Sequence, residues 1–322
     1  MTGRTRAELE AVDEAAELLG VSATRDEPLA PLTTYRVGGP AALFARPTGV
    51  ADLERLADAA TSTGLPVLVV GRGSNLLVAD SGFAGIAVSL AQLCGDARVD
   101  GTEVVAGAAV ALPVLARRAA AAGLTGFEWA VGVPGSIGGA VRMNAGGHGS
   151  DIASSLVEVH LFDLRARHHV AMPASALGLR FRGSGLADHQ LVLDARLALR
   201  VGDQAASEAA IDEIVRWRRE HQPGGQNCGS VFVNPVPGEV AAGELIDRAG
   251  LRGFAIGTAH VSQKHANFIQ ATEGGSAADV RAVIDAVRAR VADTSGYVMR
   301  SEVRLVGFDD VPSHSIETAP RP

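Results

Sequence analysis

Cysteine and aromatic residues are scarce in this chain of 322 residues, and acidic residues outnumber basic ones. The two cysteines, Cys94 and Cys228, lie far apart and form no CxxC pair, which excludes a disulfide framework and a structural zinc site. Aromatic residues make up 4% of the chain and the formal net charge is −7. The chain therefore lacks the stacking rings and the positive charge that a nucleic-acid partner requires.

Long apolar runs are also missing. No apolar run approaches the roughly 18 residues that span a bilayer, so no membrane segment is expected. The first 20 residues are typical of a charged amphipathic helix that ends at Gly20, and not of a signal peptide. These absences predict a soluble, cytoplasmic protein, which we expect to be a monomer.

The length of the chain predicts more than one domain, and 47% hydrophobic residues supply ample material for buried cores. We expect an N-terminal helix and linker over 1–32 and a β-rich unit over 33–201. A composition shift near residue 202 indicates a second unit over 202–308. Residues 309–322 are polar and contain proline, so we expect a disordered tail.

Short β-rich runs separated by glycine-containing turns dominate the first unit, and helical patterns are more frequent in the second. Strands are predicted at 65–70, 75–79, 85–90, 103–107, 156–163, 190–200 and 297–308. Helices are predicted at 51–64, 112–123, 206–220, 240–249 and 276–292, the last beginning with capping-box spacing between Ser276 and Asp279. The pattern is typical of an α+β protein.

Two glycine-rich segments offer bare backbone to a ligand. The stretch 71–75, GRGSN, lacks the third glycine of the dinucleotide fingerprint and the Gly-Lys-Ser/Thr of a P-loop. It is either a tight hairpin turn between two strands or a nest of N–H groups for a phosphate. The stretch 132–149 interleaves glycines with apolar residues, which is unusual for a plain surface loop. Together the two segments predict a nucleotide cofactor with a diphosphate.

Six motifs then occur in an order that resembles one family. They are TTYRVGGPA (33–41), VLVVGRGSNLLVAD (67–80), GFEWAVGVPGSIGGAVRMNAG (126–146), CGSVFVNP (228–235), AHVSQKHANF (259–268) and SEVRLVGF (301–308). Together they resemble UDP-N-acetylenolpyruvoylglucosamine reductase (UDP-N-acetylmuramate dehydrogenase), a flavoenzyme of bacterial peptidoglycan precursor synthesis. The short segment between Arg182 and the helix at 206 resembles the subclass that lacks the tyrosine loop.

The resemblance implies a vanillyl-alcohol-oxidase-type (PCMH-type) FAD-binding fold of two subdomains, followed by an α+β substrate-binding domain. It also implies that NADPH reduces a noncovalently bound FAD. The flavin would then reduce UDP-N-acetylglucosamine enolpyruvate to UDP-N-acetylmuramate, with a protein acid protonating the carbon next to the one that receives hydride. The cofactor-binding positions it implies are Gly71, Arg72, Gly73, Ser74, Asn75, Leu76, Pro134, Gly135, Ser136, Gly138, Gly139, Asn144 and Gly146.

Three residues match the family's catalytic positions. Ser230 matches the proton donor, although a serine beside glycine is by itself more typical of a turn or cap. Glu302 matches a glutamate that stabilises the enolic intermediate or takes part in a proton relay, whereas its charge pattern alone is typical of a solvated strand face. Arg182 matches the arginine that pairs with the substrate carboxylate, with Arg180 as its rival. Cys228 is expected to be a packing residue.

Asn234, Lys264 and His265 are expected to contact the diphosphate or the carboxylate of the substrate. The chain departs from the family pattern at Phe181 and His148, where a tyrosine is common, and at Val233, where a polar residue or lysine is frequent.

Two other functions stay open from the sequence. One is a different FAD-dependent oxidase of the same fold that uses oxygen, and the other is a non-catalytic sugar-nucleotide-binding protein. Arg182, Ser230 and Glu302 argue against the binding protein, because a binding protein needs no proton donor.

Overall fold

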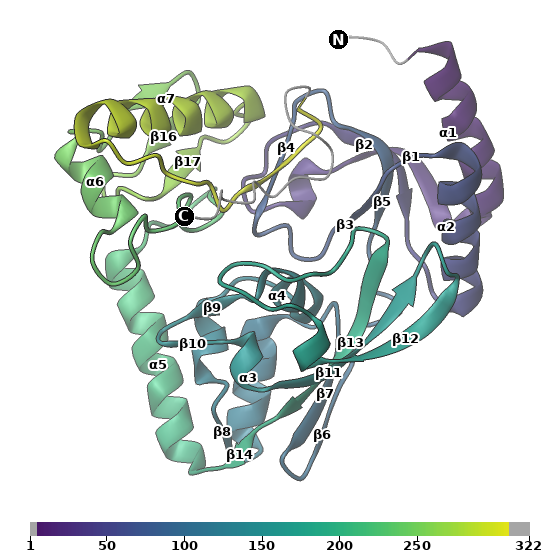
Figure 1. Ribbon diagram of the computed structural model, residues 1–322, viewed down its shortest axis with the longest axis horizontal. Helices are drawn as coiled ribbons and strands as arrows, with labels where there is room; N and C mark the ends of the chain where they lie inside the picture. The colour runs from purple at the N-terminus through teal and green to yellow at the C-terminus, as the bar shows by residue number, and fades with distance from the viewer. Residues whose placement is uncertain (1–4, 309–322) are drawn as a thin grey trace.

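The computed structural model describes residues 5–308, so the tail expected to be disordered at 309–322 lies outside the described residues. Figure 1 shows three groups of elements: one at the upper right, one below, and one at the upper left that α5 connects to the lower group. No helix of residues 5–308 is long and apolar enough to span a bilayer.

The first group is a four-stranded sheet with two helices. Its strands in spatial order are β1 (Ala23–Pro28), β2 (Pro40–Ala45), β5 (Phe83–Val88) and β3 (Val67–Val69), and its helices are α1 (Arg6–Leu19) and α2 (Val50–Thr63). The linker expected before residue 33 is wrong, because β1 pairs antiparallel with β2 there. Since β1 is an edge strand with mostly exposed side chains, it carries charges and shows no hydrophobic alternation.

The second group is a five-stranded antiparallel sheet with helices α3 (Leu112–Ala121) and α4 (Ile137–Met143). Its strands in spatial order are β12 (His168–Pro173), β11 (Leu156–Asp163), β13 (Gln190–Ala198), β7 (Glu103–Gly107) and β6 (Ala97–Asp100). Helix α5 (Gln204–His221) contacts α3, and its Ile211 belongs to the same core. The helix that follows residue 202 thus shares its core with the residues before it.

Short elements complete the first two groups and their connections. They are β8 (Leu124–Thr125) with β14 (Arg200–Val201), β9 (Gly146–Gly147) with β10 (Ser150–Asp151), and the 3-10 turns at Gly20–Ser22, Ala30–Leu32, Glu128–Gly132, Ile152–Ser154 and Ala174–Ala176.

The third group combines a three-stranded antiparallel sheet with two helices. The strands are β15 (Ala255–Ile256), β16 (Ala259–Val261) and β17 (Ile269–Ala271), and the helices are α6 (Ala242–Arg248) and α7 (Ala277–Ser295). One face of α7 is buried, with Val280, Val283 and Val287 fully enclosed. Tyr35 and Leu77 from the first 80 residues join this core, so the groups are not packed independently.

The first and third groups are joined by one short parallel pair. Strand β4 (Leu76–Val78) pairs with β18 (Arg304–Val306), close to the C-terminal end of the described chain. The long strand predicted over 297–308 is therefore wrong, because its partner is itself only three residues long. The hairpin interpretation of 71–75 is also wrong, because β3 and β4 belong to different sheets.

Asp80 reinforces this joint by capping α7 from the other side. Its carboxylate accepts hydrogen bonds from Ala277 N (2.8 Å), Ala278 N (3.0 Å) and Ser276 Oγ (2.7 Å). Ser276 is the N-cap of α7, as its spacing with Asp279 predicts. Asp279, however, accepts from Thr258 and does not complete the capping box. An acidic group from one unit thus satisfies the free N–H groups and the positive end of a helix in the other.

We expect Asp80→Ala to lower the free energy of unfolding by about 1–2 kcal/mol, the usual cost of losing a helix cap. Urea denaturation followed by circular dichroism measures the change. Asp212→Ala is the matched control, because Asp212 is exposed on α5 and makes no ion pair among residues 5–308. If both variants lose the same stability, the contact of Asp80 with α7 does not hold the units together.

Candidate active site

The two glycine-rich segments meet face to face, although 56 residues separate them in the sequence. A Cβ placed on Gly71 would lie 2.6 Å from Ser136 Oγ, and one on Gly135 would lie 3.6 Å from Ser74 Oγ. Gly73 has φ of +57°, and a Cβ there would lie 2.1 Å from the carbonyl oxygen of Leu32. Glycine at 71 and 73 is therefore required by the contact between these segments and by the packing of the first against residues 32–34.

Both segments present unused hydrogen-bond donors. Within the described residues, no hydrogen bond is donated by the backbone N–H groups of Gly71, Arg72, Gly73, Ser74, Asn75, Gly135 and Ser136. Ser136 is 3% exposed, and its hydroxyl likewise makes no hydrogen bond in this part of the chain. Consecutive free N–H groups in a glycine-rich turn form an anion-binding nest. The arrangement fits the diphosphate of a nucleotide cofactor.

The remaining predicted cofactor positions have different surroundings. Leu76 is buried in β4, whereas Arg72 and Pro134 are exposed. Gly138 and Gly139 lie in the first turn of α4, so the segment that the sequence shows as a loop contains a helix. Gly146 lies in β9, and Asn144 ends α4 in the left-handed conformation.

Asn75 ties the first segment to the C-terminal strand. Its side-chain Nδ2 donates to the carbonyl oxygen of Glu302 (2.8 Å), and its own carbonyl accepts from Arg304 N (2.9 Å). The last residue of the nest therefore holds the backbone on both sides of residue 303. Two predicted sites, one for a cofactor and one for catalysis, are thus joined directly.

Arg182 and Glu302 form an ion pair across 120 residues of sequence. Arg182 Nε donates to Glu302 Oε2 at 3.0 Å, and the two side chains are 26% and 15% exposed. Burial raises the pKa of Glu302, and the nearby Arg182 and Arg300 oppose that shift. Neither terminal nitrogen of Arg182 makes a hydrogen bond within residues 5–308, so both remain available to a second carboxylate.

The structure distinguishes Arg182 from its rival Arg180. The two do not share a strand face, because they lie in a turn in which Arg182 has φ of +55°. Arg180 donates to the carbonyl oxygen of Ser184 (2.7 Å) and so serves its own loop. The Arg182 guanidinium lies 5.0 Å from the centre of the exposed Phe181 ring, a cation–π contact that needs no tyrosine hydroxyl.

Asn144 supports this turn from α4. Its Nδ2 donates to Asp151 Oδ2 (3.1 Å) and to the carbonyl oxygen of Arg180 (3.2 Å), and its Oδ1 accepts from Ala153 N (3.3 Å). Because both amide hydrogens are used within the protein, the side chain of Asn144 positions the turn that carries Arg182.

Sequence reasoning missed an ionic hub behind the same turn. The Asp188 carboxylate pairs with Arg142 of α4 and with Arg304 of β18, the latter at 3.2 Å. Arg142 Nη1 also donates to the carbonyl oxygen of Ala187 at 2.8 Å. No spacing rule could have found this hub, because its members come from three distant segments.

The segment that carries Ser230 runs beside Glu302. Glu302 N donates to the carbonyl oxygen of Val231 at 2.8 Å, which brings Glu302 to the residue next to the serine. Asn267 fixes the same segment from the other side, accepting from Phe232 N (2.9 Å) and donating to Phe232 O (2.8 Å). Ser230 itself is exposed.

Cys228, two residues from Ser230, is buried beside Tyr35 and Glu302. Burial is the largest cause that raises the pKa of its thiol, to about 12, so the thiol is neutral. The expected packing role of Cys228 agrees with this environment.

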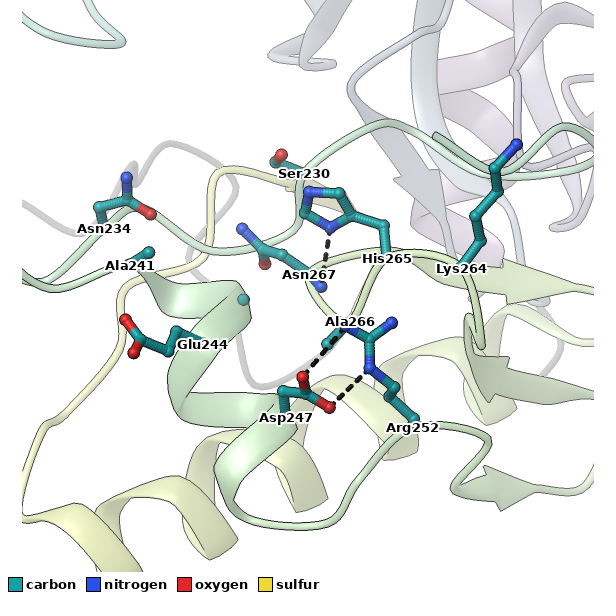
Figure 2. A pocket seen from close by; sticks show the side chains of 11 residues that line it. Ser230, Asn234, Ala241, Glu244, Asp247, Arg252, Lys264, His265, Ala266 and Asn267 are labelled. Atoms are coloured by element: carbon teal, nitrogen blue, oxygen red, sulfur yellow. Dashed lines mark hydrogen bonds and ion pairs between the residues drawn. The ribbon is translucent and has the colours of Figure 1, made fainter. Parts of the chain in front are cut away.

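Ser230 lines a cavity of about 430 Å³ together with the three predicted substrate contacts Asn234, Lys264 and His265. Figure 2 shows the Ser230 and His265 side chains near one another, with the ion pair of Asp247 and Arg252 on the other side of the cavity. A second cavity, of about 400 Å³, is lined by Arg182, Phe181, Asn144 and the β9–β10 hairpin. Ser230 thus lines one cavity and Arg182 the other. Glu302 bonds to Arg182 and to Val231, next to Ser230, and so links the segments that line the two cavities.

The three predicted substrate contacts are partly used by the protein. Asn234 Oδ1 accepts from Ala242 N (3.0 Å) at the start of α6, and Lys264 Nζ donates to Arg219 O (2.5 Å) at the end of α5. His265 Nδ1 accepts from Asn267 N at 3.2 Å. Burial lowers the pKa of His265, and Arg252 lowers it further, so the ring is neutral at pH 7.

Comparisons with known proteins agree with this geometry. Residues 41–168 match the family model "FAD binding domain", and residues 221–306 match "UDP-N-acetylenolpyruvoylglucosamine reductase, C-terminal domain". The UDP-N-acetylenolpyruvoylglucosamine reductase of Heliobacterium modesticaldum is 45% identical, with 88% of this chain and 90% of that protein covered. The reductase of Rubrobacter xylanophilus is 38% identical, with coverage of 92% and 99%.

A solved structure is similar over nearly the same range. The crystal structure of UDP-N-acetylenolpyruvylglucosamine reductase from Thermus caldophilus shares 31% identity and a TM-score of 0.75, covering 88% of this chain and 98% of the other.

The raised pKa of Glu302 predicts how stability depends on pH. The native state holds this proton more tightly than the unfolded chain, so ionising Glu302 favours unfolding. As the pH rises above about 4.5, the ordinary value, we expect wild type to lose stability relative to Glu302→Gln. Urea denaturation of both proteins at a series of pH values measures the difference. A difference that stays constant, or that shifts in favour of wild type as the pH rises, contradicts the prediction.

Proposed function

The chain belongs to the UDP-N-acetylenolpyruvoylglucosamine reductase family, and from this premise we propose that it uses NADPH to reduce UDP-N-acetylglucosamine enolpyruvate to UDP-N-acetylmuramate for peptidoglycan precursor synthesis. It is an FAD-dependent oxidoreductase. The expected fold is confirmed: a vanillyl-alcohol-oxidase-type FAD-binding architecture followed by a C-terminal α+β domain.

One observation carries the mechanistic proposal. The half-buried Arg182–Glu302 pair lies beside the segment that presents Ser230, because Glu302 bonds through its side chain to Arg182 and through its backbone to Val231. An enolate intermediate needs a cation for its carboxylate and an acid for its carbon. The arrangement supplies both.

FAD, when bound, supplies the hydride that reduces the enolpyruvyl double bond. The residues that would hold it are those of the two glycine-rich segments, whose free N–H groups suit its diphosphate. Asn75 then fixes the distance between this nest and the backbone of Glu302, since it is the last residue of the nest and its side chain donates to the carbonyl oxygen of Glu302.

Arg182 binds the carboxylate of the substrate and the enolate that develops from it. Its Nε donates to Glu302, while Nη1 and Nη2 are unused among the described residues and can donate to the two oxygens of one carboxylate. Since Glu302 also contacts the planar guanidinium, it limits the directions in which these two nitrogens point. Glu302 is thus placed to orient Arg182.

Ser230 gives the proton to carbon. Its hydroxyl is exposed in the 430 Å³ cavity, where a substrate can approach it and where water can restore the proton afterwards. A serine hydroxyl is a weak acid, but an enolate carbon is a strong enough base for this transfer. Lys264 and His265 on the same cavity wall would hold the phosphate groups of the substrate.

We expect Ser230→Ala to retain reduction of the flavin by NADPH while product formation falls by about 10²- to 10⁴-fold, the usual contribution of a general acid. Stopped-flow absorbance at the flavin band follows the first half-reaction, and chromatography of UDP-N-acetylmuramate follows the second. Cys228→Ala is the matched control, because this buried thiol is two residues away and takes no part in the proposed transfer. Turnover of Ser230→Ala at the wild-type rate would exclude the serine as the acid.

Arg182→Lys should lower kcat/KM for the enolpyruvyl substrate by about 100-fold. A lysine keeps the charge, but it cannot bond to Glu302 and also offer two further nitrogens in one plane. Arg180→Lys is the control and should stay near wild type, because Arg180 donates to carbonyl oxygens of its own loop. Steady-state kinetics at saturating NADPH separates the two. Equal losses in both variants would mean that the loop as a whole, and not Arg182, is responsible.

A further inference from the structure

An exposed tryptophan stands on the last two turns of α5. Trp217 is 42% exposed, whereas Trp129, the other tryptophan of the chain, is 4% exposed. The surface of α5 around it is otherwise charged, with Arg216, Arg219 and Glu220 as neighbours in sequence. A large indole that remains half in solvent on such a helix gains little from folding. Its position therefore needs another explanation.

Two imidazoles hold the indole in place. The rings of Trp217 and His221 are stacked, with centres 4.7 Å apart and an interplanar angle of 15°. The ring of His148 meets Trp217 edge-on, with centres 5.2 Å apart and an angle of 90°. We call Trp217, His221 and His148 the Trp217 platform. Three rings fixed in this way form a preorganised aromatic surface, which lowers the entropy cost of stacking a ligand.

The platform lies between the two cavities of the site. His148 is flanked by Gly147 and Gly149, which line the 400 Å³ cavity with Arg182. At the other side, Lys264 lines the 430 Å³ cavity with Ser230 and donates to Arg219 O, next to the platform. Figure 1 shows the end of α5 between the β9–β10 hairpin and the group that contains α6. The three rings line neither cavity themselves, so a ligand would reach them by extending beyond a cavity.

Positive charge without a carboxylate partner surrounds the platform. Arg218 makes no ion pair within residues 5–308; its Nε donates to the neutral amide oxygen of Gln222 at 2.8 Å. Burial lowers the pKa of the His148 imidazole, and Arg218 lies close enough to lower it further. Lys264 adds a second cation, bonded to a carbonyl oxygen and not to a carboxylate. Cations beside a stacking surface complement a base that carries phosphate groups.

We propose that the Trp217 platform is a stacking site for the base of a nucleoside diphosphate that enters the active site, with Arg218 and Lys264 facing its phosphates. The inference rests on the proposed function, which requires a uridine diphosphate in the substrate and an adenine nucleotide in NADPH. Both ligands have the chemistry that the platform recognises: a flat base and an anionic diphosphate. The experiment distinguishes these two sources.

Isothermal titration of the FAD-loaded protein with UDP and with 2′,5′-ADP tests the site. When an aromatic residue that stacks on a base is replaced by alanine, the affinity for the nucleotide falls about tenfold to a hundredfold. We expect Trp217→Ala to weaken one or both nucleotides by this factor, Trp217→Phe to recover most of the loss, and binding of inorganic pyrophosphate to stay unchanged. A loss for UDP assigns the platform to the substrate, and a loss for 2′,5′-ADP assigns it to the nicotinamide nucleotide.

Tyr297→Ala is the matched control, because Tyr297 is 38% exposed and lines neither cavity. The proposal is overturned if Trp217→Ala binds both nucleotides as wild type does, or if it loses pyrophosphate to the same extent, which would show a collapsed site. It is also overturned if Trp217→Phe binds no better than Trp217→Ala. Failure of the proposed function would appear elsewhere, as a wild-type protein that forms no UDP-N-acetylmuramate.

Discussion

The parallel pairing of β4 with β18 is the contact on which the rest of the site depends. These strands are three residues long, yet they join the N-terminal part of the chain to its C-terminal end. Two side chains near β4 make the joint specific: Asn75 bonds to the carbonyl of Glu302, and Asp80 caps α7. Because the phosphate nest ends at Asn75, a shift of this joint moves the nest, Glu302 and the cavity of Ser230 together. The relative positions of the nest, Glu302 and the Ser230 cavity therefore depend on one short pair of strands.

Burial of charge determines which side chains must stay paired. Glu302 is 15% exposed, and its desolvation is offset by Arg182, so removing either partner leaves a charged group poorly solvated. Asp188 has the same relation to Arg142 and Arg304 on the other side of the turn. The turn that carries Arg182 is consequently held at two points by ion pairs that reach different segments. Such a frame suits an arginine that must meet a substrate carboxylate in a fixed orientation.

Local signals predicted the local features. Glycine spacing singled out the two segments that carry free backbone N–H groups, and helix periodicity with terminal glycine or capping serine identified α2, α3 and α7. Features that depend on distant partners were mispredicted or missed. The edge strand β1 shows no alternation because most of its side chains face solvent, and β18 is short because β4 is short. Asp80, Asp188 and Trp217 carry no sequence signal, since their partners are fixed only by the fold.

The two sides of the site have opposing electrostatic requirements. In the proposed mechanism, a stronger interaction between Arg182 and the enolate would stabilise the intermediate, but it would also lower the basicity of the carbon that Ser230 is proposed to protonate. A hydroxyl cannot protonate a carbanion whose charge is fully neutralised. Arg182 must therefore compensate only part of the negative charge of the enolate. Glu302 provides this balance, because its carboxylate takes part of the charge of Arg182 while burial raises its pKa. The partly compensated arginine and the neutral serine are thus matched: each would be a poorer choice without the other.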